Sequence, residues 1–105
     1  MGLHCNESSD KLANGIEAYY DVNDQNEESS LLFSEILIEH QLNHFKSRGV
    51  KTANLFLLKN TPTVPGIILE LGFLTNEEDR AILTDETKQI EIAKSIYDAL
   101  LEIRN

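Results

Sequence analysis

The segment Val64–Asn76, VPGIILELGFLTN, constrains the fold more than any other part of the chain. It places one acidic residue, Glu70, in an otherwise apolar run that stops at Gly72. Continuous branched aliphatic residues without alternation are typical of a strand that is covered on both faces. The segment therefore predicts a buried strand, followed by a helix start at Thr75.

Glu70 is the first catalytic candidate, because a carboxylate is costly in such a run. An unpaired buried charge costs on the order of several kcal/mol, or its pKa shifts. The residue also stands near the C-terminal end of its strand, where open α/β sheets place their sites. Two structural interpretations remain open: an edge strand with the carboxylate of Glu70 in water, or a structural ion pair.

The composition limits the class of protein. A chain of 105 residues predicts a single domain, residues 1–105, near the lower end of size for a layered α/β fold. The apolar content of 41% and charged content of 26% are those of a soluble globular protein. The net charge of −9 leaves too few cations for nucleic acid or an anionic membrane surface. We therefore expect neither partner.

The single cysteine and the N-terminal residues exclude several further features. Cys5 alone forms no internal disulfide and no cysteine-based zinc cluster, and we expect it to be a small buried side chain. The first ten residues, MGLHCNESSD, have no charged and apolar regions of a signal peptide. No apolar stretch is long enough to span a bilayer.

Periodicity predicts the element order β–β–α–β–β–α–α, an α/β domain with a layered sheet flanked by helices. The alternation in Gly15–Val22 predicts a half-buried strand, in which Glu17 faces solvent. The other predicted segments are the end of a strand at Met1–Asn6, a helix from Ser29 or Ser30 to about Arg48, a strand at Leu55–Lys59, a loop at Asn60–Pro65, the Glu70 strand, and two C-terminal helices.

The predicted helix faces and caps follow from spacing. In the first helix, Leu31, Ile38, Leu42 and Phe45 recur on one face, and Gly49 stands at the expected stop. Thr75 and Glu78 fit a capping box for a short helix to about Leu83. Asp85 can cap the last helix, whose predicted buried face is Ile90, Ala93, Tyr97 and Leu100.

Two possible metal motifs are weak. The acidic loop from Asp21 lacks the glycine and the final glutamate of a calcium loop, since Leu32 stands at the twelfth place. His40 and His44 are four residues apart, but Gln41 replaces the glutamate of the HExxH motif. We expect a solvated loop and a solvated helix face, and metal sensing or storage through the two histidines is a weak alternative.

Four strings together resemble one enzyme family in order and spacing: Leu3–Asn6 (LHCN), Gly15–Tyr20 (GIEAYY), Arg48–Lys51 (RGVK) and Pro65–Asn76 (PGIILELGFLTN). They are similar to the zinc-dependent N-acetylmuramoyl-L-alanine amidases of the third amidase family. These bacterial and phage enzymes cut the bond between the lactyl group of muramic acid and the first alanine of the peptidoglycan stem. The resemblance extends through the closing helix Thr87–Ile103.

The resemblance implies roles for two residues. His4 matches the last zinc ligand, in the family's His-x-Asn stretch, and Glu70 matches the catalytic glutamate of its Glu-x-Gly-Phe motif. Zinc polarises the amide carbonyl and acidifies its bound water, whose proton the glutamate can accept. Glu17 could orient His4, since ligating histidines usually need a partner for the second ring nitrogen.

The chain also departs from the family. The other two zinc ligands, a histidine in a Gly-rich turn and a glutamate, have no counterpart here, so the resemblance implies an incomplete Zn²⁺ site. The chain thus resembles the later portion of an amidase domain, with the N-terminal part of the fold missing. We expect an exposed strand edge and apolar surface, and hence self-association or docking of a complementary N-terminal segment.

The resemblance leaves two functions open. The first is a peptidoglycan amidase that is inactive as this isolated chain and works in the cell wall or outside the cell as a complete enzyme. The second is a non-catalytic shortened homologue that binds the cell wall or a partner.

Overall fold

The computed structural model describes residues 1–23, 25–54 and 66–104. Its elements are β1 (Gly2–Asn6), β2 (Ile16–Asp21), α1 (Glu27–Glu39), β3 (Ser47–Ala53), β4 (Ile67–Phe73), α2 (Glu77–Leu83) and α3 (Glu86–Arg104). Their order agrees with the predicted one except at β3, which lies before the predicted strand at Leu55–Lys59. The strands form one mixed sheet in the order β1-β4-β2-β3. The predicted α/β class is therefore confirmed.

Strand β4 lies inside the sheet, between β1 and β2. It runs parallel to β1, in the register His4↔Glu70, and antiparallel to β2, in the register Glu17↔Glu70. Strand β3 pairs in parallel with β2 at the other end of the sheet. Because β4 has a neighbour on each side, Glu70 does not stand on an edge strand.

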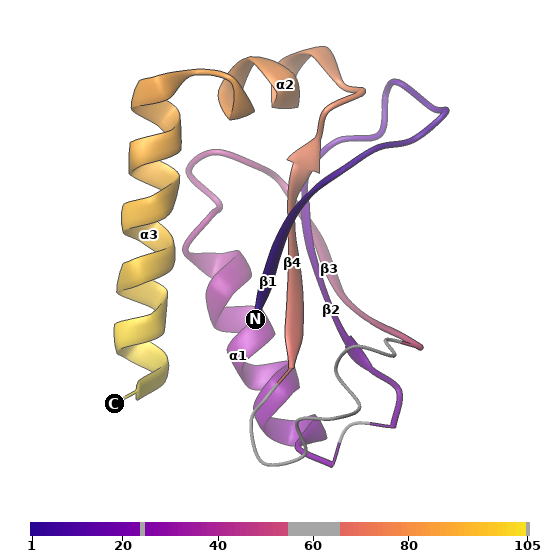
Figure 1. Cartoon of the computed structure of the whole chain (residues 1–105), viewed down its shortest axis with the longest axis vertical. Helices are drawn as coiled ribbons and strands as arrows, with labels where there is room; N and C mark the ends of the chain where they lie inside the picture. Colours follow the sequence, from indigo (N-terminus) through magenta and orange to yellow (C-terminus); the bar gives the residue numbers. More distant parts are fainter. Residues whose placement is uncertain (24, 55–65, 105) are drawn as a thin grey trace.

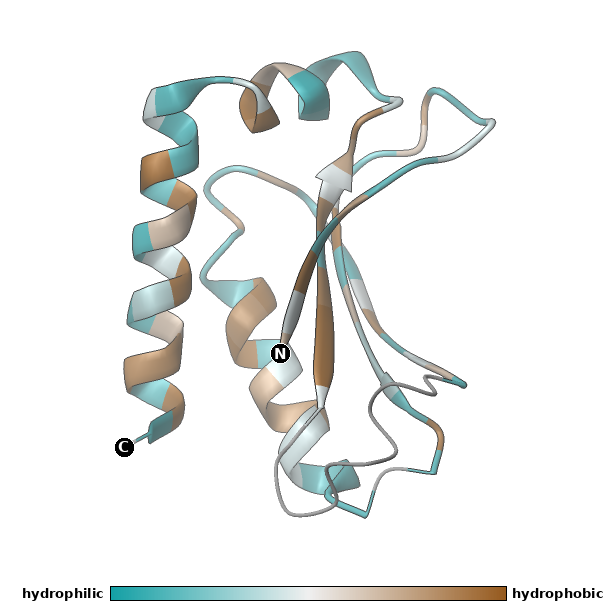
Figure 2. Ribbon diagram, viewed as in Figure 1, coloured by the Kyte–Doolittle hydropathy of each residue, from teal (hydrophilic) through white to brown (hydrophobic). Residues whose placement is uncertain are grey.

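All three described helices lie on one side of the sheet (Figure 1). Helix α1 packs on β2, β3 and β4, whereas α3 packs on α1 and α2. The core between these layers consists of buried apolar side chains: Ile16, Ala18, Leu37, Ile38, Phe45, Ile67, Leu69, Ile92, Ile96 and Ala99. Figure 2 shows β4 as a mostly hydrophobic strand. No described helix covers the opposite face of the sheet, which we call the open face.

Strand β2 is more buried than its alternation predicts. Ile16, Ala18 and Tyr20 point into the core as expected, but Glu17 is also buried, with 2% of its surface exposed. The prediction of a half-buried strand with a solvent-facing Glu17 is wrong. The strand has neighbours on both sides, and side chains on the open face cover the glutamate.

Helix α1 ends nine residues earlier than predicted, and β3 occupies the difference. His40 caps the helix at its C-terminus, and a turn follows in which the amides of His44 and Phe45 donate to the carbonyl of Gln41. This turn carries Phe45 into the core. Arg48 and Gly49 therefore lie in a strand, not at a helix end. The predicted strand at Leu55–Lys59 and loop at Asn60–Pro65 fall outside the described residues.

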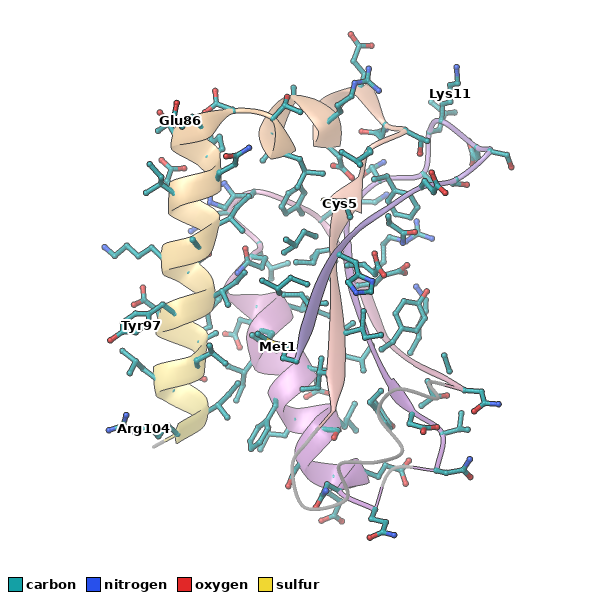
Figure 3. The ribbon with its side chains drawn as sticks, in the orientation of Figure 1. Met1, Cys5, Lys11, Glu86, Tyr97 and Arg104 are labelled. Atoms are coloured by element: carbon teal, nitrogen blue, oxygen red, sulfur yellow. The ribbon has the colours of Figure 1, made fainter. Side chains whose placement is uncertain are left out.

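The buried helix faces also differ from the predicted ones. In α1 the buried residues are Ser30, Ser34, Leu37 and Ile38, while Leu31 and Leu42 are exposed. In α3 they are Ile92, Ile96 and Ala99, while Ile90, Tyr97 and Leu100 are exposed. Tyr97 lies on the side of α3 away from the sheet (Figure 3). Apolar residues at helical spacing predicted that these segments form helices. They did not predict which face of each helix packs against the core.

The predicted N-caps are wrong for two of the helices and right for the third. At α1 neither predicted serine caps the helix, because Asn26 stands at the N-cap and Ser30 is buried inside it. At α2 the cap is Asn76, whose side chain accepts the amide of Asp79, and not Thr75. At α3 the prediction is confirmed, since Asp85 Oδ1 accepts the amide of Lys88 at 2.9 Å.

The end of the sheet at β1 exposes apolar surface. Leu3 is 48% exposed, and β1 pairs only with β4 among the described strands. A cavity of about 230 Å³ opens between this strand and α3, lined by Leu3, Cys5, Leu71, Leu83, Ile92 and Ile96. Among the described residues, no helix is both long and apolar enough to cross a membrane.

Candidate active site

His4 and Glu70 meet on the open face of the sheet. They are register partners on the parallel pair β1 and β4, and His4 Nδ1 lies 3.6 Å from Glu70 Oε1. Side chains of directly paired residues project from the same face, so this proximity is a consequence of register. Each stands at the middle of its strand, His4 as the third of five residues in β1 and Glu70 as the fourth of seven in β4, so Glu70 is not near the C-terminal end as the sequence predicts.

The surroundings of Glu70 favour its protonated form. Burial raises the pKa of the Glu70 carboxyl above its usual value, His4 acts in the opposite direction, and the charge of Glu17 raises it further. The result is a carboxylate that holds a proton more readily than one in water. A group of this kind can take a proton from a water molecule and release it later.

His4 presents an accessible imidazole. Its side chain is 54% exposed. An accessible neutral imidazole nitrogen is a good zinc ligand. Nevertheless, no group of three metal-binding side chains occurs among the described residues.

Glu17 is the centre of a buried polar network beside Glu70. Its Oε1 atom accepts Asn6 Nδ2 at 2.7 Å and the Tyr19 hydroxyl at 3.0 Å. Its Oε2 atom accepts Arg48 Nε at 3.2 Å and also Lys51 Nζ. Burial by itself would raise the pKa of Glu17, but the hydrogen bonds from Lys51, Tyr19 and Arg48 outweigh it and lower the pKa.

This network spans the sheet. Asn6 lies on β1, Glu17 on β2, and the two cations on β3, so the hydrogen bond from Asn6 crosses over β4. The sequence predicted Glu17 as a solvated residue, with orientation of His4 as the alternative. The hydrogen bonds of Glu17 instead tie it to Asn6, two residues beyond His4. Only the order of the strands in the sheet brings Asn6 and Glu17 together. The spacing of residues within Gly15–Tyr20 therefore could not have predicted their hydrogen bond.

A second buried carboxylate, Asp79, fixes the end of β4. Its Oδ2 atom accepts the amides of Gly15 at 2.8 Å and Phe73 at 3.0 Å. Gly72 adopts φ 137°, and a Cβ there would lie 2.9 Å from the ring of Phe45. The Glu-Leu-Gly-Phe segment therefore needs its glycine for both conformation and space. No sequence motif had singled out Asp79, because its two hydrogen-bond partners, Gly15 and Phe73, lie outside α2.

The other sequence candidates lie away from this site or do not form one. His40 and His44 are not on one solvated helix face: His40 lies 3.1 Å from Glu102, and the mostly buried His44 lies 3.8 Å from Glu91. Asp21 is buried and accepts the amide of Asn23, and α1 begins where a calcium loop would continue. Cys5 is exposed, contrary to expectation, because it lies on the end strand of the sheet.

The chain is similar to known amidases over almost its whole length. Residues 1–102 match the model of the N-acetylmuramoyl-L-alanine amidase family. The N-acetylmuramoyl-L-alanine amidase LytC of Bacillus subtilis is 30% identical over 99 residues, 93% of this chain and 20% of LytC.

Solved structures agree with this match. The CwlD amidase of Clostridioides difficile, determined in complex with the GerS lipoprotein, is 27% identical with a TM-score of 0.82. The catalytic domain of the amidase CwlV from Bacillus (Paenibacillus) polymyxa is 29% identical with a TM-score of 0.77. The similarity covers 96% and 95% of this chain, but only 51% and 54% of those chains. The chain thus spans about half the length of these solved relatives.

Proposed function

The chain belongs to the N-acetylmuramoyl-L-alanine amidase family, and from that premise we propose that it provides part of the active site of a peptidoglycan amidase. The bond cleaved joins N-acetylmuramic acid to L-alanine. Two relatives, from two strains of Staphylococcus epidermidis, are named "Probable cell wall amidase LytH", which supports a cell-wall or extracellular site of action for the complete enzyme. The observation that carries the proposal is the proximity of His4 and Glu70 on the open face.

Glu70 acts as the general base in this proposal. A water molecule between the substrate carbonyl and Glu70 gives its proton to the carboxylate as it attacks the carbonyl carbon. Glu70 then delivers the proton to the nitrogen of alanine, and the amide bond breaks. The raised pKa of Glu70 supports this role, because the carboxyl must hold the proton between the two transfers.

His4 is proposed as one ligand of a catalytic Zn²⁺. When bound, zinc supplies a Lewis acid that polarises the carbonyl and acidifies water. Catalytic zinc sites use three protein ligands, and among the described residues His4 has no partners to complete such a set. We therefore expect no turnover by this chain alone.

The remaining ligands must come from a partner segment. The exposed end of the sheet at β1 and the apolar cavity beside it offer a place where such a segment, or a second copy of the chain, could pair. Sedimentation of the chain across a concentration series is a direct measurement. We expect weak self-association, and a monomer that is independent of concentration would contradict this part of the proposal.

The test uses a chimera in which this chain replaces the matching portion of the CwlV catalytic domain. We expect about one Zn²⁺ per molecule and release of dye from labelled cell walls. His4→Ala should abolish both, whereas the matched control His40→Ala should retain both. A folded chimera that binds zinc equally well without His4 would refute the assignment of this ligand.

A non-catalytic role is the second candidate, favoured by the lack of three clustered ligands among the described residues. In that case the chain would bind cell walls, and the chimera would neither bind stoichiometric zinc nor release dye. Wall binding by the chain with no hydrolysis by a well-folded chimera would favour this alternative.

A further inference from the structure

The cations of the Glu17 network exceed the charge that they neutralise. Glu17 carries one negative charge and is buried, whereas Arg48 and Lys51 carry two positive charges and remain partly exposed. Arg48 uses only Nε toward Glu17, and its terminal amino groups have no acceptor among the described residues. The guanidinium is held in place over the Phe73 ring, with Cζ 4.9 Å from the ring centroid. In a chain of net charge −9, Arg48 and Lys51 therefore form a pair of partly exposed cations that share one buried carboxylate partner.

The position of these cations relative to Glu70 is fixed by the sheet. Glu17 is the antiparallel register partner of Glu70, so their Cβ atoms are about 5 Å apart. Both cations reach Glu17 from β3 on the open face, which no described helix covers. A polar row therefore runs from His4 through Glu70 to the two cations.

We propose that Arg48 and Lys51 form a subsite for a carboxylate on the peptide side of the substrate. The inference rests on the proposed function, because Glu70 marks the position of the cleaved amide. Two extended residues span about 7 Å, so a carboxylate at the end of the second residue of the stem reaches the cations. The alternative is that the cations only neutralise Glu17, in which case the charge of the ligand has no effect.

The experiment measures binding without zinc and without turnover. The chain is titrated with N-acetylmuramoyl-L-alanyl-glycine and with the same compound amidated at its C-terminus. We expect the acid to bind roughly five-fold more tightly than the amide, as for a partly exposed ion pair. The preference should shrink as salt is added. Equal binding of acid and amide, or binding of neither, would overturn the proposal.

Two variants make the test independent of folding defects. Lys51→Gln alone leaves Glu17 with one cation fewer, so it is combined with Glu17→Gln to avoid an underpaired buried charge. The double variant keeps one net positive charge, as the unchanged network does, so its acid preference should fall below that of Glu17→Gln alone and stay close to that of the unchanged chain. Glu17→Gln alone frees both cations and should increase the preference, and an unchanged ratio in a folded variant would contradict the subsite.

Failure here is distinguishable from failure of the proposed function. If the CwlV chimera does not hydrolyse cell walls while the chain still prefers the acid, the subsite stands and the catalytic assignment fails. If the chimera is active and the chain shows no preference, only the subsite fails.

Discussion

The two faces of the sheet are built by the same strands and carry different kinds of side chain. On the face under α1 lie Ile67, Leu69 and Ala18, which are buried in the apolar core. On the open face lie His4 and Glu70, with the Glu17 network beside them. Successive residues of a strand project to opposite faces, so a single strand serves both. The comparison teaches that substitutions on one face should change stability, and those on the other should change chemistry.

The largest effect is expected on the open face. Glu70→Gln keeps the size of the side chain but removes the base, so the CwlV chimera should lose roughly two to four orders of magnitude in hydrolysis rate. Dye release from labelled walls is the measurement. The urea unfolding midpoint of the variant chain should not fall. A variant that keeps its activity, or loses it only by unfolding, would break the distinction between the faces.

Two neighbouring residues of β4 allow a matched comparison of stability. Leu69 is fully buried under α1, whereas Ile68 lies on the open face and is partly exposed. We expect Leu69→Ala to cost about 2–5 kcal/mol of unfolding free energy, and Ile68→Ala to cost about 1 kcal/mol. Urea denaturation of the chain gives both values. If the two variants lost the same unfolding free energy, Ile68 would be as buried as Leu69, and the open face would be covered.

The end of β4 should depend on Asp79. Asp79→Ala leaves the amides of Gly15 and Phe73 without their acceptor, at roughly 1–3 kcal/mol for each buried group. Asp79→Asn keeps an oxygen at the same place and should cost less than half as much. If both variants lost the same stability, the charge of Asp79 and not its hydrogen bonds would be the cause.

The smallest effect is expected on the pH dependence of stability. Glu17 and Glu70, which are register partners, should change the unfolding free energy in opposite directions as the pH falls. The pKa of Glu17 is lowered in the folded chain, so its contribution is present above its unfolded pKa of about 4.5 and is lost as pH falls through the folded pKa. The pKa of Glu70 is raised, so its contribution is present below about 4.5 and is lost as pH rises through the folded pKa.

Urea midpoints across the acidic and neutral range separate these contributions. Glu17→Gln should flatten the loss of stability on acidification, and Glu70→Gln should flatten the loss on approach to neutral pH. Parallel profiles for the two variants would show that the glutamates do not differ in environment as the two sets of contacts require.

Much of the site followed from local chemistry. An acidic residue in the aliphatic run of β4 already indicated a special carboxylate, and the His-x-Asn and Glu-x-Gly-Phe strings indicated its partner. The register places His4 beside Glu70 at 3.6 Å, although their chemical roles remain proposals. Strand β3 was missed, because SRGVKTA has little apolar content and Gly49 resembles a helix stop.

The sequence by itself determined the α/β class, the amidase family and the order of the elements other than β3, because these depend on periodicity and on motifs that are contiguous in the chain. Only the tertiary structure decided where α1 ends, which stripe of α3 packs inward, and that Glu17 is buried. The physical reason is that burial and pairing depend on neighbours from other strands. Asn6, Glu17 and Lys51 are far apart in the chain. They meet because the sheet has the strand order β1-β4-β2-β3, which brings their three strands, β1, β2 and β3, close together.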